Sequence, residues 1–309
     1  MPHVASSRVQ SDRRRAVVAN QALRLLATVA LGVLAMCISK AYAQNMTLEG
    51  QTGGFITPTA YTVPTEAGHL FSKPVVGFHF VAAGSVIGSV YTLSATEGLA
   101  NRFEVGYTRS MHSNGENPYY SPLWFFNGFH VIHGKATLIT EEMGKHAWVP
   151  AVAVGGVYRW DDHYVSGAIA NTTYNNGDVY IVATRTLRKT KPPLLLNFGV
   201  KGTNASIFGI GGNSPDFVAR MFGGLGIALP LFHGLIAVPA AGFTQEPQSV
   251  KNLPGADIPT TLDYAVRITQ REDPKWTFDA GVGQVAGWIL PGVNLEARSV
   301  FGMGFSYKF

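Results

Sequence analysis

Three adjacent side chains that could do chemistry stand together in "RWDDHY": Asp161, Asp162 and His163. Two carboxylates and an imidazole could bind a metal ion, or could act as an acid–base pair in a hydrolase. The same three residues are also typical of a solvated loop tip between two strands. We favour the loop tip, and we keep a hydrolase built on this cluster as an alternative.

The histidines elsewhere do not form a second candidate site. His130 and His133 are three residues apart in "GFHVIHG", so in a strand they point to opposite faces and cannot share a ligand. His79 alternates with Phe78 and Phe80, which predicts that it lines the inner, polar face of a strand. No G-x-S-x-G, H-E-x-x-H or phosphate-loop pattern occurs. We therefore expect no enzyme activity, no metal and no cofactor.

The elements that would position these residues are strands, because apolar and polar side chains alternate in segment after segment. Turn signals such as "NNGD", "GGNSPD" and "REDP" separate these segments. Residues 129–138 and 148–160 alternate less well. The clearest alternating segments are residues 102–108, 194–201, 262–269, 275–282 and 295–309.

Residues 222–243 are the one stretch that challenges a strand interpretation, since these 22 residues carry no Asp, Glu, Lys or Arg. Such a stretch could be a transmembrane helix. However, Pro230, Pro239 and several glycines would each destabilise a helix. A hairpin fits better, with one strand up to Leu229, a turn near residues 230–234 and a second strand after it.

The pattern favours a membrane barrel over a soluble sandwich. Aromatic residues lie at the ends of the apolar faces, as in the interfacial girdles of transmembrane barrels: Trp148, Trp160, Trp276, Tyr307 and Phe309. The opposite face is small or charged, which a wet lumen accepts and a sandwich core does not. The lumen-lining candidates are Arg102, Glu104, Asp263, Arg267, Asp279, Glu296 and Arg298. We predict an all-β, antiparallel, up-and-down transmembrane β-barrel of about 12 strands, within a range of 10 to 14.

The N-terminus has the features of a cleavable signal peptide. Arg13, Arg14 and Arg15 precede the apolar run of residues 23–36, and "AYA" ends at Ala43. Cleavage between the small-residue motif Ala41–Ala43 and Gln44 would remove Cys37, the only cysteine. The expected organisation is a signal in residues 1–43, a Thr/Gly/Pro-rich periplasmic or lumenal lead-in in residues 44–68 and a barrel in residues 69–309.

The basic charge of the chain lies in the signal. Residues 1–43 hold six of the 24 basic and one of the 19 acidic residues, so 18 of each remain after cleavage. A nucleic-acid partner therefore has no electrostatic support.

The last strand resembles the closing strand of Gram-negative outer-membrane proteins. Phe301, Phe305, Tyr307 and the terminal Phe309 match their alternate aromatic positions, with Met303 as the one non-aromatic residue between them. The resemblance implies a location in the outer membrane, in contact with its lipid. It also implies recognition by the barrel-assembly machinery and by periplasmic chaperones.

A second segment, "GGFITPTA" (residues 53–60), is similar to the opening motif of barrels associated with exopolysaccharide secretion. Gly54, Thr57, Pro58 and Ala60 carry the similarity, although the motif is one residue shorter here. "TEGLANRFEVGYT" (residues 96–108) resembles the strand–turn–strand units of the same barrels. The similarity implies a possible partner in an export system.

The function that the sequence favours is a channel or transporter for small solutes. Because the candidate lumen charges nearly cancel, no strong preference for anions or cations is expected. The main alternative is a non-conducting structural or assembly barrel for exopolysaccharide export, whose lead-in fills the lumen or binds a partner.

Overall fold

The structure is a computed structural model that describes residues 45–309 apart from 122–127, 147, 162–172, 249–253 and 273. Its strands account for most of the described chain, and its helices are single turns: α2 (Gly84–Ile87), η2 (Met143–Lys145) and η3 (Ile207–Gly209). None of the helices among the described residues is long and apolar enough to cross a membrane. The strands are β1 (Val75–Ala82), β2 (Ser89–Leu99), β3 (Phe103–Ser113), β4 (Phe129–Ile139), β5 (Ala151–Asp161), β6 (Asn176–Leu187), β7 (Leu194–Ala205), β8 (Asn213–Ile227), β9 (Leu229–Pro230), β10 (Leu235–Thr244), β11 (Thr261–Gln270), β12 (Trp276–Gln284), β13 (Ala286–Leu290), β14 (Val293–Ala297) and β15 (Val300–Lys308).

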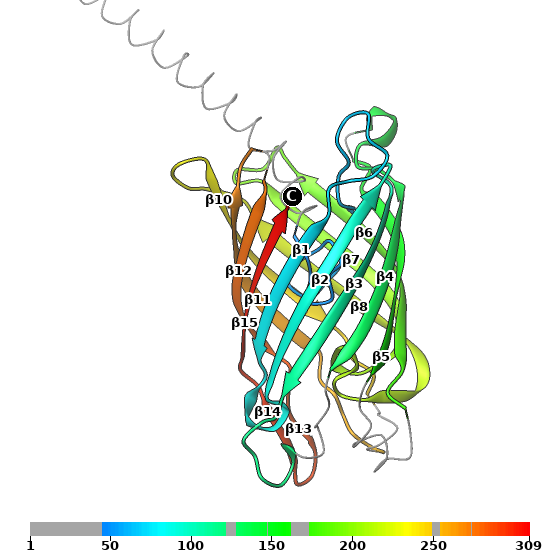
Figure 1. The fold of residues 1–309 in the computed structure, drawn as a ribbon, viewed down its shortest axis with the longest axis vertical. Helices are drawn as coiled ribbons and strands as arrows, with labels where there is room; N and C mark the ends of the chain where they lie inside the picture. Colours follow the sequence, from blue (N-terminus) through cyan, green and yellow to red (C-terminus); the bar gives the residue numbers. More distant parts are fainter. Residues whose placement is uncertain (1–44, 122–127, 147, 162–172, 249–253, 273) are drawn as a thin grey trace, which may run out of the picture.

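The strands form one closed barrel (Figure 1). The wall strands follow one another in the order β1 to β8, β10, β11, β12 and β15, and each pairs antiparallel with the next. The barrel closes because β15 also pairs with β1. The two-residue β9 follows β8 after Ala228 and pairs with the same partner, β10, so the two make one wall strand. The barrel therefore has 12 strands, which confirms the predicted fold and count. The hairpin predicted for residues 222–243 is also confirmed, as β8–β9 and β10.

The two ends of the barrel differ. At the terminal end, which holds the C-terminus, tight turns such as residues 100–102 and 231–234 join the strands. Ala100 and Asn101 both have φ of 54°, the left-handed conformation that a two-residue hairpin turn requires. At the loop end the connections are longer, and the β13–β14 hairpin lies there (Figure 1).

The outer face of the wall is apolar and the inner face polar. On β3, for example, Val105 is 64 % exposed while its neighbour Glu104 is 3 % exposed. An exposed apolar band with a closed hydrogen-bonded wall is the surface of a barrel immersed in lipid. Large exposed apolar side chains on successive strands include Phe78, Leu93, Val105, Ile132, Val154, Ile181, Phe198, Leu225, Val266, Phe278 and Phe305.

The final alternating segment is not one strand, contrary to the prediction for residues 295–309. The alternation of outer and inner side chains holds from Val300 onward, and exposed on the outer face are Phe301, Phe305, Tyr307 and Phe309. Before Val300 the chain forms the β13–β14 hairpin, in which Glu296 has a φ of 54°. This break in the extended backbone turns Leu295 and Ala297 inward, where both are fully buried.

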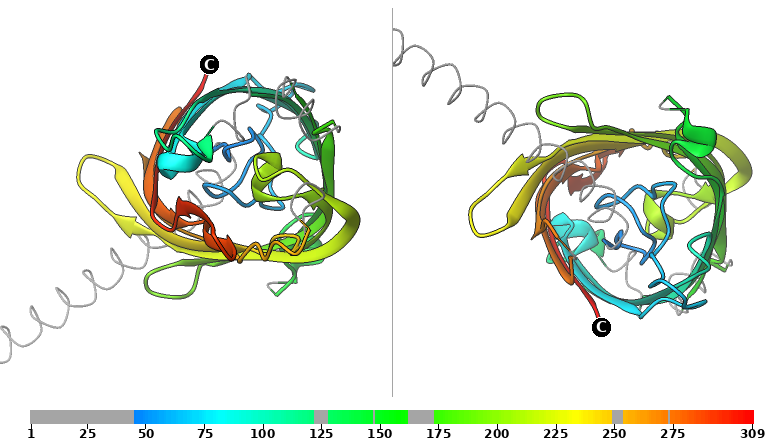
Figure 2. Two further views of the ribbon diagram at one scale, coloured as in Figure 1. Left: turned by 90° about the horizontal axis from the view of Figure 1, so that it is seen from below. Right: turned by 90° about the horizontal axis from the view of Figure 1, so that it is seen from above.

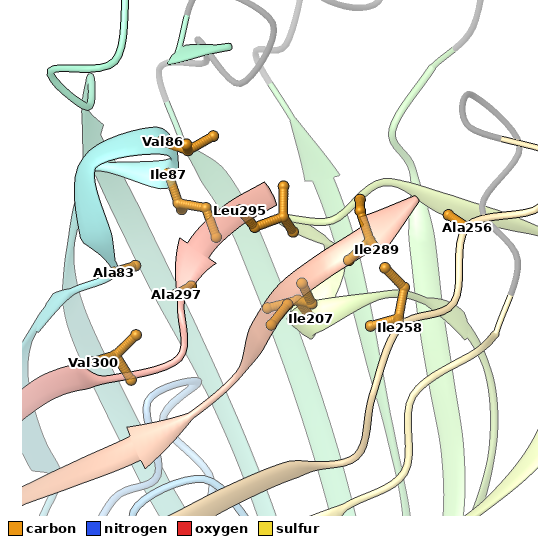
Figure 3. Packing of buried hydrophobic residues seen from close by; sticks show 11 residues of the cluster. Ala83, Val86, Ile87, Ile207, Ala256, Ile258, Ile289, Leu295, Ala297 and Val300 are labelled. Carbon is orange, nitrogen blue, oxygen red and sulfur yellow. The ribbon is translucent and has the colours of Figure 1, made fainter. Parts of the chain in front are cut away.

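An apolar cap lies inside the loop end of the barrel (Figure 3). Here the term "cap" means the buried cluster Ala83, Val86, Ile87, Ile207, Ala256, Ile258, Ala286, Ile289, Leu295, Ala297 and Val300. These side chains come from α2, η3, the segment before β11, the β13–β14 hairpin and the start of β15. Burial of this apolar surface holds the loop segments together across the wall strands.

Glu246, in the connection after β10, joins this cap to the wall. Its carboxylate accepts hydrogen bonds from the Ile207 backbone N–H (2.9 Å) and the Thr261 hydroxyl (3.4 Å). Burial raises the pKa of the Glu246 carboxyl, although Lys201 opposes the shift. A raised pKa means that this group favours folding most below its ordinary pKa and loses that contribution as the pH rises.

The variant Glu246→Gln should therefore be more stable than the parent at pH 8, with a difference that shrinks toward pH 4. The amide keeps an acceptor for Ile207 but carries no charge to desolvate. The temperature of the heat-induced shift in gel mobility measures this difference. Glu272→Gln, at an exposed turn residue, is the matched control. A larger gain at pH 4 than at pH 8 would contradict the assignment.

Candidate gate in the barrel lumen

Residues 45–63 lie inside the barrel and are here called the plug (Figure 2). Viewed along the barrel axis from either end, this segment winds within the ring of strands. Most of its residues are buried, and Met46, Thr52, Ala60 and Val63 are wholly inaccessible. The chain leaves the lumen at the terminal end through residues 64–74 and then enters β1.

Short-range hydrogen bonds give the plug its shape. Thr47 accepts a backbone hydrogen bond from Gly50 (2.9 Å) and donates one to Gln51 (2.7 Å), which closes a tight turn with Gly50 at φ +82°. A second turn joins the Gly54 N–H to the Thr57 carbonyl (2.8 Å). At Gly53 a side chain would collide with the Thr57 carbonyl, so the close approach of the two turns requires glycine there.

One buried carboxylate on the wall organises the middle of the plug. Glu104 accepts hydrogen bonds from the Thr52 N–H (3.0 Å) and hydroxyl (2.6 Å) and from the Val63 N–H (3.2 Å). Lys135, opposite Glu104 on β4, forms an ion pair with it at 3.3 Å and donates to the Thr52 carbonyl at 3.0 Å. Both charged side chains are inaccessible to solvent. The pair therefore depends on the plug to complete its hydrogen bonding.

A second buried ion cluster joins the plug to β5 and β6. Arg159 donates from Nη2 to Glu49 of the plug (2.7 Å) and to Asp178 of β6 (2.6 Å), and its Nε also contacts Glu49. Arg159 Nη1 donates to Asn176 (3.2 Å). The Arg159 side chain is 1 % exposed, so two carboxylates from different parts of the chain share one desolvated cation.

Polar side chains of the wall also satisfy the backbone of the plug. These contacts come from polar residues at lumen-facing positions of β1 to β4, β6 and β7, while β5 contributes Arg159 as described above. They are His79 with the Met46 carbonyl (3.0 Å), Thr96 with the Gly50 carbonyl (2.6 Å), Thr108 with the Glu49 carbonyl (2.9 Å), Thr137 with the Ala60 carbonyl (2.7 Å), Thr184 with the Ala60 N–H (2.8 Å) and Asn197 with the Pro58 carbonyl (3.0 Å). Tyr180 adds a side-chain bond to Gln51 at 2.8 Å.

A clamp holds the plug where it reaches the terminal end. The Tyr61 hydroxyl lies 3.0 Å from a Glu141 carboxylate oxygen and 2.8 Å from the Thr186 hydroxyl. Glu141 pairs in turn with Arg185 (2.9 Å) and Arg188 (3.3 Å). Burial, reinforced by the Glu141 charge, raises the pKa of the Tyr61 phenol, so the hydroxyl keeps its proton and can donate throughout the ordinary pH range.

Four of the seven predicted lumen-lining residues lie on the inner face of the wall. Glu104 contacts the plug as described, and Asp263, Arg267 and Asp279 are buried on β11 and β12. Arg267 and Asp279 are cross-strand partners, joined by a bond of 2.8 Å from Nε to Oδ1. The predicted motif residues Gly54, Thr57, Pro58 and Ala60 all belong to the plug.

The other three predicted lumen residues lie elsewhere. Arg102 sits in the turn before β3, where its guanidinium donates to the carbonyls of Thr137 and Leu138. Glu296 and Arg298 lie in and just after β14, and both are exposed. In all three cases the strand whose period predicts a lumenal position begins only after the residue, β3 at Phe103 and β15 at Val300.

The histidines follow the sequence interpretation. His79 and His133 are buried toward the lumen, whereas His130 packs its ring on Trp160 at 5.3 Å between centroids. Asp161 ends β5, and Asp162 and His163 lie outside the described residues, as do the proposed cleavage residues Ala41, Ala43 and Gln44. Within the part of the chain that the structure describes, no group of three His, Cys, Asp or Glu could hold a metal ion.

Sequence reasoning did not identify the residues that bind the plug: Glu49, Lys135, Arg159 and Asp178. A signal was present, since Lys135 and Arg159 are isolated cations in otherwise apolar segments. Such charges within a membrane-spanning element imply buried partners. The partners could not be named, because Glu49 and Arg159 are 110 residues apart.

The arrangement can act as a gate. The plug is held mainly by hydrogen bonds and ion pairs, and an aqueous lumen could satisfy those groups if the plug moved. An apolar seal would instead expose hydrophobic surface to water on opening. We therefore expect that moving the polar plug out of place costs less free energy than moving an apolar plug of the same size.

Comparison with known proteins shows no family for this chain. No protein-family model matches it, and no curated protein does. LpxR from Salmonella typhimurium has a similar solved structure (10 % identity over 76 % of this chain and 100 % of that one, TM-score 0.45). Also similar is the NanC porin, with 10 % identity over 76 % of this chain and 100 % of that one and a TM-score of 0.41. A third similar structure is the translocator domain of the autotransporter NalP from Neisseria meningitidis, with 9 % identity over 79 % of this chain and 90 % of that one and a TM-score of 0.38. Identities and TM-scores this low support no conclusion about the function of this chain.

Proposed function

We propose that the protein is an outer-membrane β-barrel that admits small solutes when its N-terminal plug is released from the lumen. The observation that carries the proposal is the polar attachment of residues 45–63 to the wall through Glu104, Lys135 and Arg159. The apolar outer band supports a membrane location, and the even strand number puts the start of β1 and the end of β15 on one side of the membrane. That side would be the periplasm, with the longer loops outside.

The terminal strand supports the same location. Its outward aromatic residues Phe301, Phe305, Tyr307 and Phe309 suit recognition by an assembly machinery during insertion, and periplasmic chaperones would protect the chain beforehand. The signal in residues 1–43 would direct export.

A second candidate is a closed barrel that serves exopolysaccharide export. One observation favours it: the segment that resembles the motif of such barrels is the one that fills the lumen. Under this function the plug would stay in place, and a partner in the export system would bind the terminal end.

Osmotic swelling of proteoliposomes tests the two functions. Vesicles that contain residues 44–309 should swell slowly in small sugars, and vesicles that contain a chain lacking residues 45–63 should swell fast. A smaller sugar should enter faster than a larger one in both cases. Equal impermeability of both proteins, with both correctly folded, would rule out the transport function and favour the closed barrel.

A further inference from the structure

The plug does not fill the lumen evenly. Its polar contacts described above reach β1 to β7, and two adjoining cavities lie between it and the wall, lined chiefly by β10, β11 and β12, with further residues from β1, β2, β7, β8 and β15. The larger cavity has a volume of about 70 Å³ and the smaller about 30 Å³. Phe55 of the plug and Asp263 and Ala265 of β11 line both, so the two meet at these residues.

The larger cavity is apolar. Leu48, Phe55 and Ile56 of the plug form one side, and the cap contributes Ile87 and Ile207 on the other. An apolar cavity stays dry and accepts apolar ligands. Its volume corresponds to roughly five water-sized groups, which is the size of a short hydrocarbon chain or a small ring.

Asp263 is the polar feature where the cavities meet. It is 8 % exposed, and its Oδ1 atom has no hydrogen-bond partner among the described residues. The cross-strand neighbour Gly242 leaves the space that Oδ1 occupies, because a side chain at that position would collide with it. A buried carboxylate oxygen without a donor is costly, and a ligand that donates a hydrogen bond would remove this cost.

The charges around the cavities favour a cationic donor. Arg267 and Asp279 line the smaller cavity and form a two-bond pair, Nε to Oδ1 at 2.8 Å and Nη2 to Oδ2 at 3.4 Å. These two charges balance each other, so the group with Asp263 has a formal charge of −1. An ammonium group near Asp263 would neutralise it, whereas a carboxylate there would be repelled.

We propose that the double cavity binds a small amphipathic ammonium compound, with its apolar body between plug and cap and its ammonium group on Asp263. Binding there does not depend on whether solutes cross the barrel. A ligand in this position would contact the plug through Leu48, Phe55 and Ile56 and the wall through Asp263 and Ala265. It would be bound in the closed form of the lumen.

Isothermal titration calorimetry on residues 44–309, refolded and held in amphipol without detergent, tests the site with three probes. n-Hexylammonium should bind saturably, n-hexanol about tenfold more weakly, and hexanoate not at all. Asp263→Asn should weaken n-hexylammonium about tenfold and leave n-hexanol nearly unchanged. Ala265→Leu, which fills the junction of the cavities, should weaken both.

Asp216→Asn is the matched control, because it removes an exposed carboxylate that lines neither cavity and should change neither affinity. Gel mobility before and after heating shows that each variant is folded. The proposal is overturned by an absence of saturable n-hexylammonium binding. Equal affinity in the parent and in Asp263→Asn, or binding of hexanoate as tight as that of n-hexylammonium, would overturn it as well.

Discussion

Replacing Arg159 with methionine should release the plug from the wall. The substitution keeps most of the side-chain volume but leaves the carboxylates of Glu49 and Asp178 buried and without their shared cation. Breaking a buried ion pair in this way costs about 3–5 kcal/mol. Because the strand ladder of the barrel does not depend on Arg159, we expect the plug to move and the carboxylates to become hydrated. The population with a released plug should rise by roughly two to three orders of magnitude.

A single cysteine in the plug measures this population, since residues 44–309 contain no other cysteine. Thr59→Cys is suitable because Thr59 is 2 % exposed in the closed lumen, and it should react with a membrane-impermeant maleimide only after release. The rate should rise strongly with Arg159→Met and less with Glu49→Gln, which leaves the Arg159–Asp178 pair intact. Arg102→Met, at the turn before β3, should not change it. An unchanged rate in folded Arg159→Met protein would show that the cluster does not hold the plug.

The Glu104–Lys135 pair should show strong coupling in a double-mutant cycle. Glu104→Gln leaves a buried ammonium without a counter-ion, and Lys135→Met leaves a buried carboxylate without its partner. Each single change should lower the free energy of unfolding by about 3 kcal/mol. The double variant buries no isolated charge. Its free energy of unfolding should therefore fall by less than the sum of the decreases in the two single variants.

Urea unfolding of the refolded protein, followed by tryptophan fluorescence, gives these free energies. Lys189→Met, at an exposed turn residue, controls for the loss of a lysine as such. Strictly additive effects of Glu104→Gln and Lys135→Met would mean that the two side chains do not act as a pair in the folded lumen.

The wall of the barrel could be predicted because its strands alternate between two very different environments. Two segments with a weaker pattern form strands as well, β4 and β5. Residues 129–138 and 148–160 alternate weakly because the inner faces of β4 and β5 also carry apolar residues, including Phe129, Val131 and Val157, which are buried in one cluster with Ala60 of the plug. Both faces of these strands are therefore partly apolar, and the period-two signal fades.

The site could be predicted less well than the wall. Inward charges such as Glu104, Asp263 and Asp279 follow from the period of their own strands. Their partners do not, because a pair such as Glu49 and Arg159 forms only when the barrel closes around the plug. Local period also gives no warning that a strand begins late. The period of β15 predicts Glu296 and Arg298 in the lumen, although they lie in and just after β14, before β15 begins at Val300.

Single-channel conductance in a planar bilayer tests most directly whether the plug closes the lumen. The comparison is between residues 44–309 and the same chain without residues 45–63, both inserted and both shown to be folded by their heat-dependent gel mobility. We expect long silent periods with rare openings from the first protein. From the second we expect steady steps whose size rises with salt concentration. The same steady conductance from both proteins, or silence from both, would contradict the proposal that residues 45–63 gate this barrel.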